Sequence, residues 1–125
     1  MRRNELPSVL IVEAQSLIRM DAVDMIVEAG LRTYEADSAD QAILFMEQHA
    51  DIGILFTDIE MPGSMDRLKL AAYVRDSWPQ VVIIIASGAT DIDAMKFPEG
   101  ASFFPKPYST SQIISSLQQV AQRYS

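Results

Sequence analysis

Short apolar runs alternate with amphipathic stretches along the whole chain of 125 residues. The apolar runs are rich in β-branched residues and are bounded by turn-forming residues, which is the pattern of buried β-strands. We therefore predict strands at Ser8–Val12, Leu31–Ala36, Ile52–Thr57, Val81–Ala86 and Ala101–Phe104.

The stretches between these runs carry apolar residues three and four positions apart, as the buried face of a helix does. Two capping boxes, Ser38–Gln41 and Ser109–Gln112, open helices, and Pro79 and Pro98 each end one. We predict helices at Ser16–Ala29, Ser38–His49, Leu68–Trp78 and Asp91–Phe97, and a last one from Ser109 to residue 122.

Strand and helix patterns that alternate in this way predict an α/β fold. Right-handed crossovers then give a five-stranded parallel sheet with helices on both faces. The sequence contains no linker, repeat or low-complexity tract, and the last helix reaches the C-terminus. We therefore expect a single domain over residues 1–125, with a core at residues 8–122 and no second domain attached.

Composition excludes several classes of function. The net charge is −7 and the pI is about 4.5, which argues against direct binding to nucleic acid because such binding needs clustered Lys and Arg. The chain has no cysteine, so disulfides and thiolate metal sites are excluded. The apolar run Val9–Val12 is too short for a signal peptide or a membrane span. We expect a cytoplasmic protein without membrane contact.

Polar residues that can take part in catalysis or ligand binding follow the ends of the predicted strands. Glu13 and Asp58 follow two of the runs, Ser87 follows a third, and Lys106-Pro107 follows the last. Open α/β sheets bind their ligands beyond the carboxyl ends of the strands. An ionised Asp58 placed there is suited to act as a nucleophile. A lysine can neutralise the charge of a phosphoryl group, and a hydroxyl can donate a hydrogen bond to it.

Four motifs give the chain a family resemblance. They are V-L-I-V-E-A at 9–14, F-T-D-I-E-M-P-G at 56–63, I-I-A-S-G at 84–88 and F-P-K-P-Y at 104–108. With these motifs the chain resembles the receiver domains of two-component response regulators over residues 8–122. The resemblance implies a flavodoxin-like (βα)5 fold with strand order 2-1-3-4-5.

The resemblance also implies roles for individual residues. Asp58 would be the phosphoacceptor, which takes a phosphoryl group from a histidine kinase or a histidine phosphotransfer protein. Lys106 would contact that group. Ser87 and Phe103 would be the switch residues, which report phosphorylation to the output surface.

The family binds Mg²⁺, and this chain departs from the family at that site. The resemblance assigns as ligands Glu13, Asp58 and the backbone carbonyl of Glu60. The family usually has an acidic pair after the first strand, but here the second acid is replaced by Ala14. The methyl group cannot bind a metal, so we expect weak Mg²⁺ binding. The carboxylate of Glu60 either stands in for the missing acid or points to solvent.

The leading hypothesis is a phosphorylation-controlled receiver that switches a protein partner in trans. The surface for this output would be the predicted helix Asp91–Phe97 with the strand and helix that follow it. Such a protein is not an enzyme beyond slow self-catalysed uptake and hydrolysis of the phosphoryl group. The cognate kinase, the output partner and homodimerisation stay open.

Two alternatives remain. The first is a pseudo-receiver, an interaction module in which Ala14 has removed efficient phosphorylation. The second is a phosphatase with an aspartate nucleophile, because Asp58-Ile59-Glu60 echoes the D-x-D motif of haloacid-dehalogenase-like enzymes. Those enzymes need acidic residues after their lysine, and no acid follows Lys106.

Overall fold

Five parallel strands form one sheet in the order β2-β1-β3-β4-β5. The computed structural model describes residues 6–59, 65–87, 100–105 and 109–122. Within these ranges the strands are β1 (Ser8–Val12), β2 (Thr33–Ala36), β3 (Ile52–Ile59), β4 (Val82–Ser87) and β5 (Ser102–Pro105). The predicted flavodoxin-like order is confirmed.

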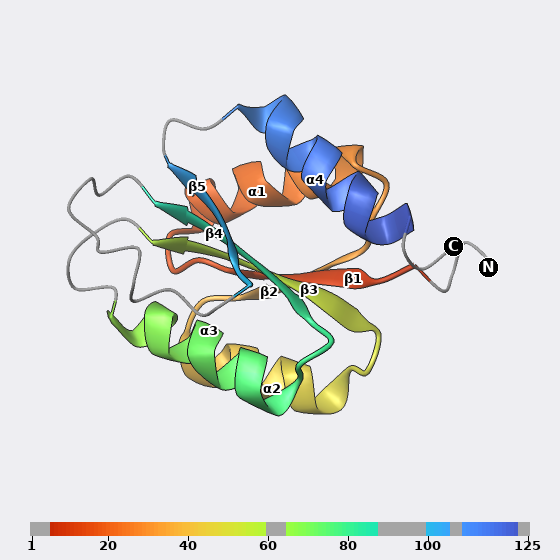
Figure 1. Cartoon of the computed structure of the whole chain (residues 1–125). Helices are drawn as coiled ribbons and strands as arrows, with labels where there is room; N and C mark the ends of the chain where they lie inside the picture. The colour runs from red at the N-terminus through yellow and green to blue at the C-terminus, as the bar shows by residue number, and fades with distance from the viewer. Residues whose placement is uncertain (1–5, 60–64, 88–99, 106–108, 123–125) are drawn as a thin grey trace.

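The described helices cover both faces of the sheet, α1 and α4 on one face and α2 and α3 on the other (Figure 1). None of them is long and apolar enough to cross a membrane. The predicted helix Asp91–Phe97 lies outside the described residues. The label α4 therefore belongs to the fifth predicted helix, the one expected from Ser109 to residue 122. The helices are α1 (Ser16–Glu28), α2 (Ala39–Gln48), α3 (Met65–Ser77) and α4 (Thr110–Gln122).

The core consists of two apolar layers, one on each face of the sheet. Leu55 lies in the layer with α2 and α3, whereas its neighbour Phe56 lies in the layer with α1 and α4. Both side chains are fully buried, as are those of β1 at Leu10 and Ile11. Burial on both faces explains why the strands read as continuous apolar runs.

Two strands extend further than their apolar runs predict. β3 continues through Asp58 to Ile59, and β4 continues to Ser87. The reason is that pairing goes on past the last apolar residue, with Asp58 opposite Ala86 and Ile59 opposite Ser87. Ladder hydrogen bonds depend on the backbone, so a polar side chain at the end of a strand does not stop them.

β2 begins two residues later than predicted, at Thr33. Gly30 adopts a positive φ of 89°, which turns the chain out of α1 at low steric cost. Leu31 is then buried in the core, and its amide donates to the carbonyl of Ile26 at 3.3 Å. Leu31 therefore closes the end of the helix and does not belong to the strand.

A polar network around Asp51 joins three strands at the amino edge of the sheet, which is the edge where the parallel strands begin. The hydroxyl of Ser8 donates to Oδ2 of Asp51 at 2.6 Å, and the hydroxyl of Tyr34 lies 3.0 Å from Oδ2 and 3.1 Å from Oδ1. Arg32 forms an ion pair with the same carboxylate at 3.9 Å, and the ring of His49 stacks on Tyr34. Ser8 and Tyr34 belong to β1 and β2, and Asp51 is the turn residue directly before β3.

This network lowers the pKa of Asp51. Partial burial alone would raise the pKa, but the hydrogen bonds from Ser8 and Tyr34 and the charge of Arg32 together outweigh it. Because the pKa is lower in the folded state than in the unfolded one, the contribution to stability is complete above the unfolded pKa. It is lost as the pH falls through the folded pKa.

We predict that Asp51→Asn lowers the free energy of unfolding at pH 7 by about 1–2 kcal/mol, the range for hydrogen bonds to a charged group reduced by solvent screening. The difference from the unaltered chain should shrink below about pH 4. Urea unfolding at pH 7 and pH 3 measures both effects. Asp76→Asn is the control, because Asp76 is exposed and forms an ion pair with its neighbour Arg75. Equal effects of the two variants would contradict the prediction.

Candidate functional site

The carboxyl ends of β1, β3 and β4 meet at one edge of the sheet. Val12 lies opposite Thr57, so the residues that follow, Glu13 directly after β1 and Asp58 within β3, lie at the same level on neighbouring strands. β4 ends at Ser87, whose partner on β3 is the residue directly after Asp58. The fold thus brings together the main chain of three residues that the sequence selects.

The remaining predicted residues continue from the same edge. Ser87 is paired with Pro105 on β5, and Lys106 follows Pro105 in the sequence. Lys106 and Glu60 lie outside the described residues. For Asp58 and Ser87 the structure describes the main chain in β3 and β4.

Glu13 is the acid that the structure describes in full, and it is only 2% exposed. Its backbone N–H donates to the carbonyl of Ala36 at 3.0 Å, and its Oε1 accepts from the N–H of Gln15 at 3.2 Å. A buried carboxylate is costly unless hydrogen bonds or opposite charges compensate it. The β1–α1 turn is therefore built to hold an acid at this edge. Ala14, the next residue, is exposed.

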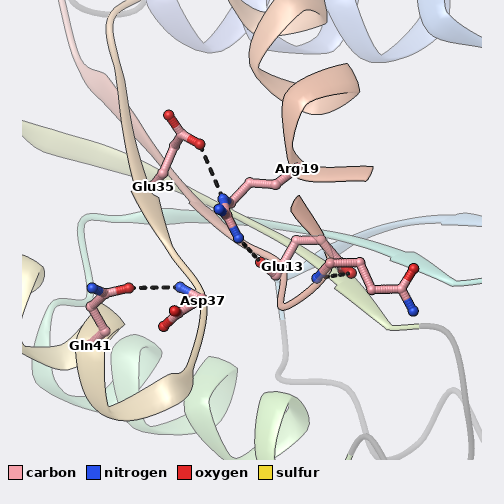
Figure 2. Close-up of polar contacts among 6 residues, drawn as sticks. Glu13, Arg19, Glu35, Asp37 and Gln41 are labelled. Carbon is pink, nitrogen blue, oxygen red and sulfur yellow. Dashed lines mark hydrogen bonds and ion pairs between the residues drawn. The ribbon is translucent and has the colours of Figure 1, made fainter. Parts of the chain in front are cut away.

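Arg19 on α1 reaches back to this turn, as Figure 2 shows. Its Nη1 donates to the carbonyl oxygen of Glu13 at 2.8 Å, and its Nε donates to Oε1 of Glu35 on β2 at 3.1 Å. The arginine side chain is 20% exposed and that of Glu35 47%. One guanidinium thus links α1, the end of β1 and β2.

Sequence reasoning missed Arg19, although a signal was present. The amino end of a helix favours negative charge, because its free N–H groups carry partial positive charge. α1 has no acidic residue in its first turn and no side-chain cap at Gln15, yet Arg19 lies close to this end. A cation at an unfavourable place near a helix start indicates that partners outside the helix hold it there.

The oxygen donors at this edge fit Mg²⁺ in kind. Mg²⁺ is a hard cation that takes carboxylate and carbonyl oxygens and keeps several waters. Glu13 supplies one buried carboxylate, whereas Ala14 supplies no donor. Among the residues whose side chains are described, no group of three Asp, Glu, His or Cys is placed to hold a metal. The predicted site therefore also needs Asp58 and Glu60.

Phe103, the predicted switch aromatic, lies on β5 and is 39% exposed. It borders a groove of about 600 Å³ between β5 and α4. The groove is lined by Phe103, Phe104, Ser111, Gln112, Ser115, Ser116 and Gln119. An exposed aromatic beside such a groove suits a surface that contacts another protein.

Residues 9–118 match the family model of the response regulator receiver domain. Among curated proteins, the sensor kinase CckA of Brucella abortus is 31% identical in an alignment 120 positions long, which covers 93% of this chain and 13% of that protein. The transcriptional regulatory protein PdtaR of Mycobacterium tuberculosis is 28% identical, with 93% of this chain and 57% of that protein covered. The chain thus spans only part of the curated relatives it matches.

Solved structures agree with this match. A response regulator receiver protein from Pseudomonas putida superposes with a TM-score of 0.77 at 26% identity and covers 91% of this chain and 97% of its own. A receiver protein from Sinorhizobium medicae reaches 0.82 at 21% identity, with 98% of this chain and 99% of its own covered. At 21% identity, the similarity to the Sinorhizobium medicae protein shows only that the fold is shared.

Thr57 stands directly before Asp58 and is completely buried. Its Oγ1 is the one buried side-chain polar atom in the described part of the chain that has no hydrogen-bond partner. A buried hydroxyl without a partner loses its bonds to water and gains nothing in return.

We predict that Thr57→Val raises the free energy of unfolding by about 1 kcal/mol, because valine has nearly the same shape and no polar atom to desolvate. Urea unfolding measures the change. Thr33→Val is the control, since Thr33 is on β2 and only half buried. A loss of stability in Thr57→Val would contradict the prediction and would mean that the hydroxyl forms a bond in the folded protein.

Proposed function

The chain belongs to the response regulator receiver domain family, and from this premise we propose that Asp58 accepts a phosphoryl group from a phosphorylated histidine. One observation carries the proposal. The β1–β3 register brings Glu13 level with Asp58 at the edge where β4 delivers Ser87. Ligands of open α/β sheets bind at such an edge.

The proposed reaction is a displacement at phosphorus. A carboxylate oxygen of Asp58 attacks, and an O–P bond forms as the N–P bond to the histidine breaks. The imidazole nitrogen keeps the electron pair, and the ring takes up one proton from water to leave as neutral imidazole. The product is an acyl phosphate. Because the transition state spreads negative charge over three equatorial oxygens, positioning and neutralisation of charge are the main tasks of the protein.

Three groups of this chain serve these tasks in the proposal. Lys106 supplies a positive charge from the segment after β5, and Ser87 supplies a hydroxyl donor at the end of β4. Glu13, Asp58 and the Glu60 carbonyl would hold Mg²⁺, which supplies further positive charge when it is bound. The protein acts as a phosphoacceptor and, beyond slow self-catalysed turnover, not as an enzyme.

We further propose that the phosphoryl donor is a histidine kinase or a histidine phosphotransfer protein. The output in this proposal is a partner protein that binds in trans at the groove between β5 and α4, beside Phe103. Residues 1–125 then work as one receiver domain. Phosphorylation would act by biasing two states of this surface.

A second candidate is a pseudo-receiver that binds partners without efficient phosphorylation. It is favoured by the exposed methyl of Ala14, which gives no oxygen where the family usually has an acid. The two candidates differ in one measurable property, the uptake of a phosphoryl group.

We predict that acetyl phosphate with Mg²⁺ adds the mass of one phosphoryl group to the chain and that Asp58→Asn abolishes the addition. An amide is a poor nucleophile, so no acyl phosphate can form. Intact-mass spectrometry measures the adduct. Asp37→Asn is the control, because Asp37 is an exposed acid after β2, at the same edge. An adduct that persists in Asp58→Asn would refute the assignment, and no adduct on the unaltered chain would favour the pseudo-receiver.

We predict that Ala14→Asp strengthens Mg²⁺ binding by about 1–3 kcal/mol, the value of a charge-assisted contact. Calorimetric titration is the suitable measurement. The single tryptophan, Trp78, follows α3 and contacts Tyr73 at the amino edge of the sheet, away from the site. Gln48→Glu is the control, because it adds the same charge at an exposed position at the end of α2. Unchanged affinity in Ala14→Asp would mean that Glu13 or Glu60 already does the work of the missing acid.

A further inference from the structure

Arg19 binds the main chain of Glu13, the acid that follows β1. Its guanidinium donates to the Glu13 carbonyl and to the Glu35 carboxylate. We propose that Arg19 is a positioning residue that holds the Glu13 carboxylate in the orientation needed for Mg²⁺. The inference rests on the proposed function, because it assumes that Glu13 serves as a metal ligand there.

The geometry of Glu13 shows how an arginine behind it can orient its carboxylate. The peptide before Glu13 is fixed by the bond from its N–H to the carbonyl of Ala36. The peptide after it is fixed by the bond from Arg19 to its carbonyl oxygen at 2.8 Å. Peptide units are planar, so fixing both of them fixes the direction in which the side chain leaves the backbone. The bond from the Gln15 amide to Oε1 then orients the carboxylate itself.

This support matters more here than beside a full acidic pair. Mg²⁺ demands near-octahedral geometry and gives up its waters reluctantly. With Ala14 next to it, Glu13 is the one acid that this turn offers, so an error in its orientation is not compensated by a neighbour. Groups that orient a ligand without touching the metal commonly affect affinity strongly.

The positive charge of Arg19, taken alone, would weaken Mg²⁺ binding, which is the opposite of the effect expected from positioning. Its positive charge lies at the turn that would hold a cation, and Glu35 balances that charge only in part because it is half exposed. If charge decided the matter, neutralising Arg19 would strengthen Mg²⁺ binding. If positioning decides it, the same substitution weakens Mg²⁺ binding. The sign of the change therefore separates the two roles.

The test is a calorimetric titration of the full chain with Mg²⁺, without any phosphoryl donor. We expect Arg19→Gln to weaken binding roughly tenfold, the lower end of the loss for residues that orient a ligand. Arg19→Lys should lose about as much, because an ammonium cannot donate to two oxygens in the fixed fork of a guanidinium.

Arg32→Gln is the matched control. Arg32 also donates to a backbone carbonyl, that of Leu6 at 3.0 Å, and also forms an ion pair with a carboxylate, that of Asp51. It does so at the amino edge of the sheet. We expect Arg32→Gln to leave Mg²⁺ affinity unchanged, because its contacts lie at the opposite edge of the sheet.

Several results would overturn the inference. They are unchanged or tighter Mg²⁺ binding in Arg19→Gln, wild-type affinity in Arg19→Lys, an equal loss in Arg32→Gln, and no Mg²⁺ binding by the unaltered chain. The proposed function fails separately, when the unaltered chain takes up no phosphoryl group. Weakened Mg²⁺ binding in Arg19→Gln would support the positioning role even then.

Discussion

The register between β1 and β3 is the constraint on which the candidate site depends. Because Val12 lies opposite Thr57, the main chains of two acids, Glu13 after β1 and Asp58 near the end of β3, lie at one level. Both faces of these strands are buried and apolar, so the alternation of polar and apolar residues does not specify the register in the usual way. Contacts outside the two apolar layers must therefore help to hold the register between β1 and β3.

The polar network at the amino edge supplies that hold. Ser8 is joined to Asp51 twice, from its hydroxyl at 2.6 Å and from its N–H to the Asp51 carbonyl at 2.8 Å. Just above this point the pairing shifts between Ser8 and Val9, so Gly53 is passed over and the strands proceed in step to the other edge. A slip by one residue would break both bonds. The amino edge therefore anchors β1 beside β3 before this shift, and the pairing from Val9 to Val12 carries the strands in step to the carboxyl edge.

The sequence predicted the strands, their order by resemblance, and the polar residues at their ends. It placed the ends of β3 and β4 too early, because Asp58 and Ser87 interrupt the apolar pattern while backbone pairing continues. It missed Arg19 and the Asp51 network for another reason. Arg19 and Glu35 are 16 positions apart and Ser8 and Asp51 are 43 apart. The sequence can mark Arg19 as unusual near a helix start, but no local pattern names the partner in either pair, and only the folded backbone brings the partners together.

The replacement of an acid by Ala14 has a consequence for the folded state as well as for the metal. Two adjacent carboxylates beside Asp58 would repel each other and would need a cation to be accommodated away from water. Glu13, with a single carboxylate, is only 2% exposed. The N–H of Gln15 donates to its Oε1, and Arg19 donates to its carbonyl oxygen. We infer that this turn is ordered by the protein itself. We therefore expect Mg²⁺ to add little to the stability of this turn.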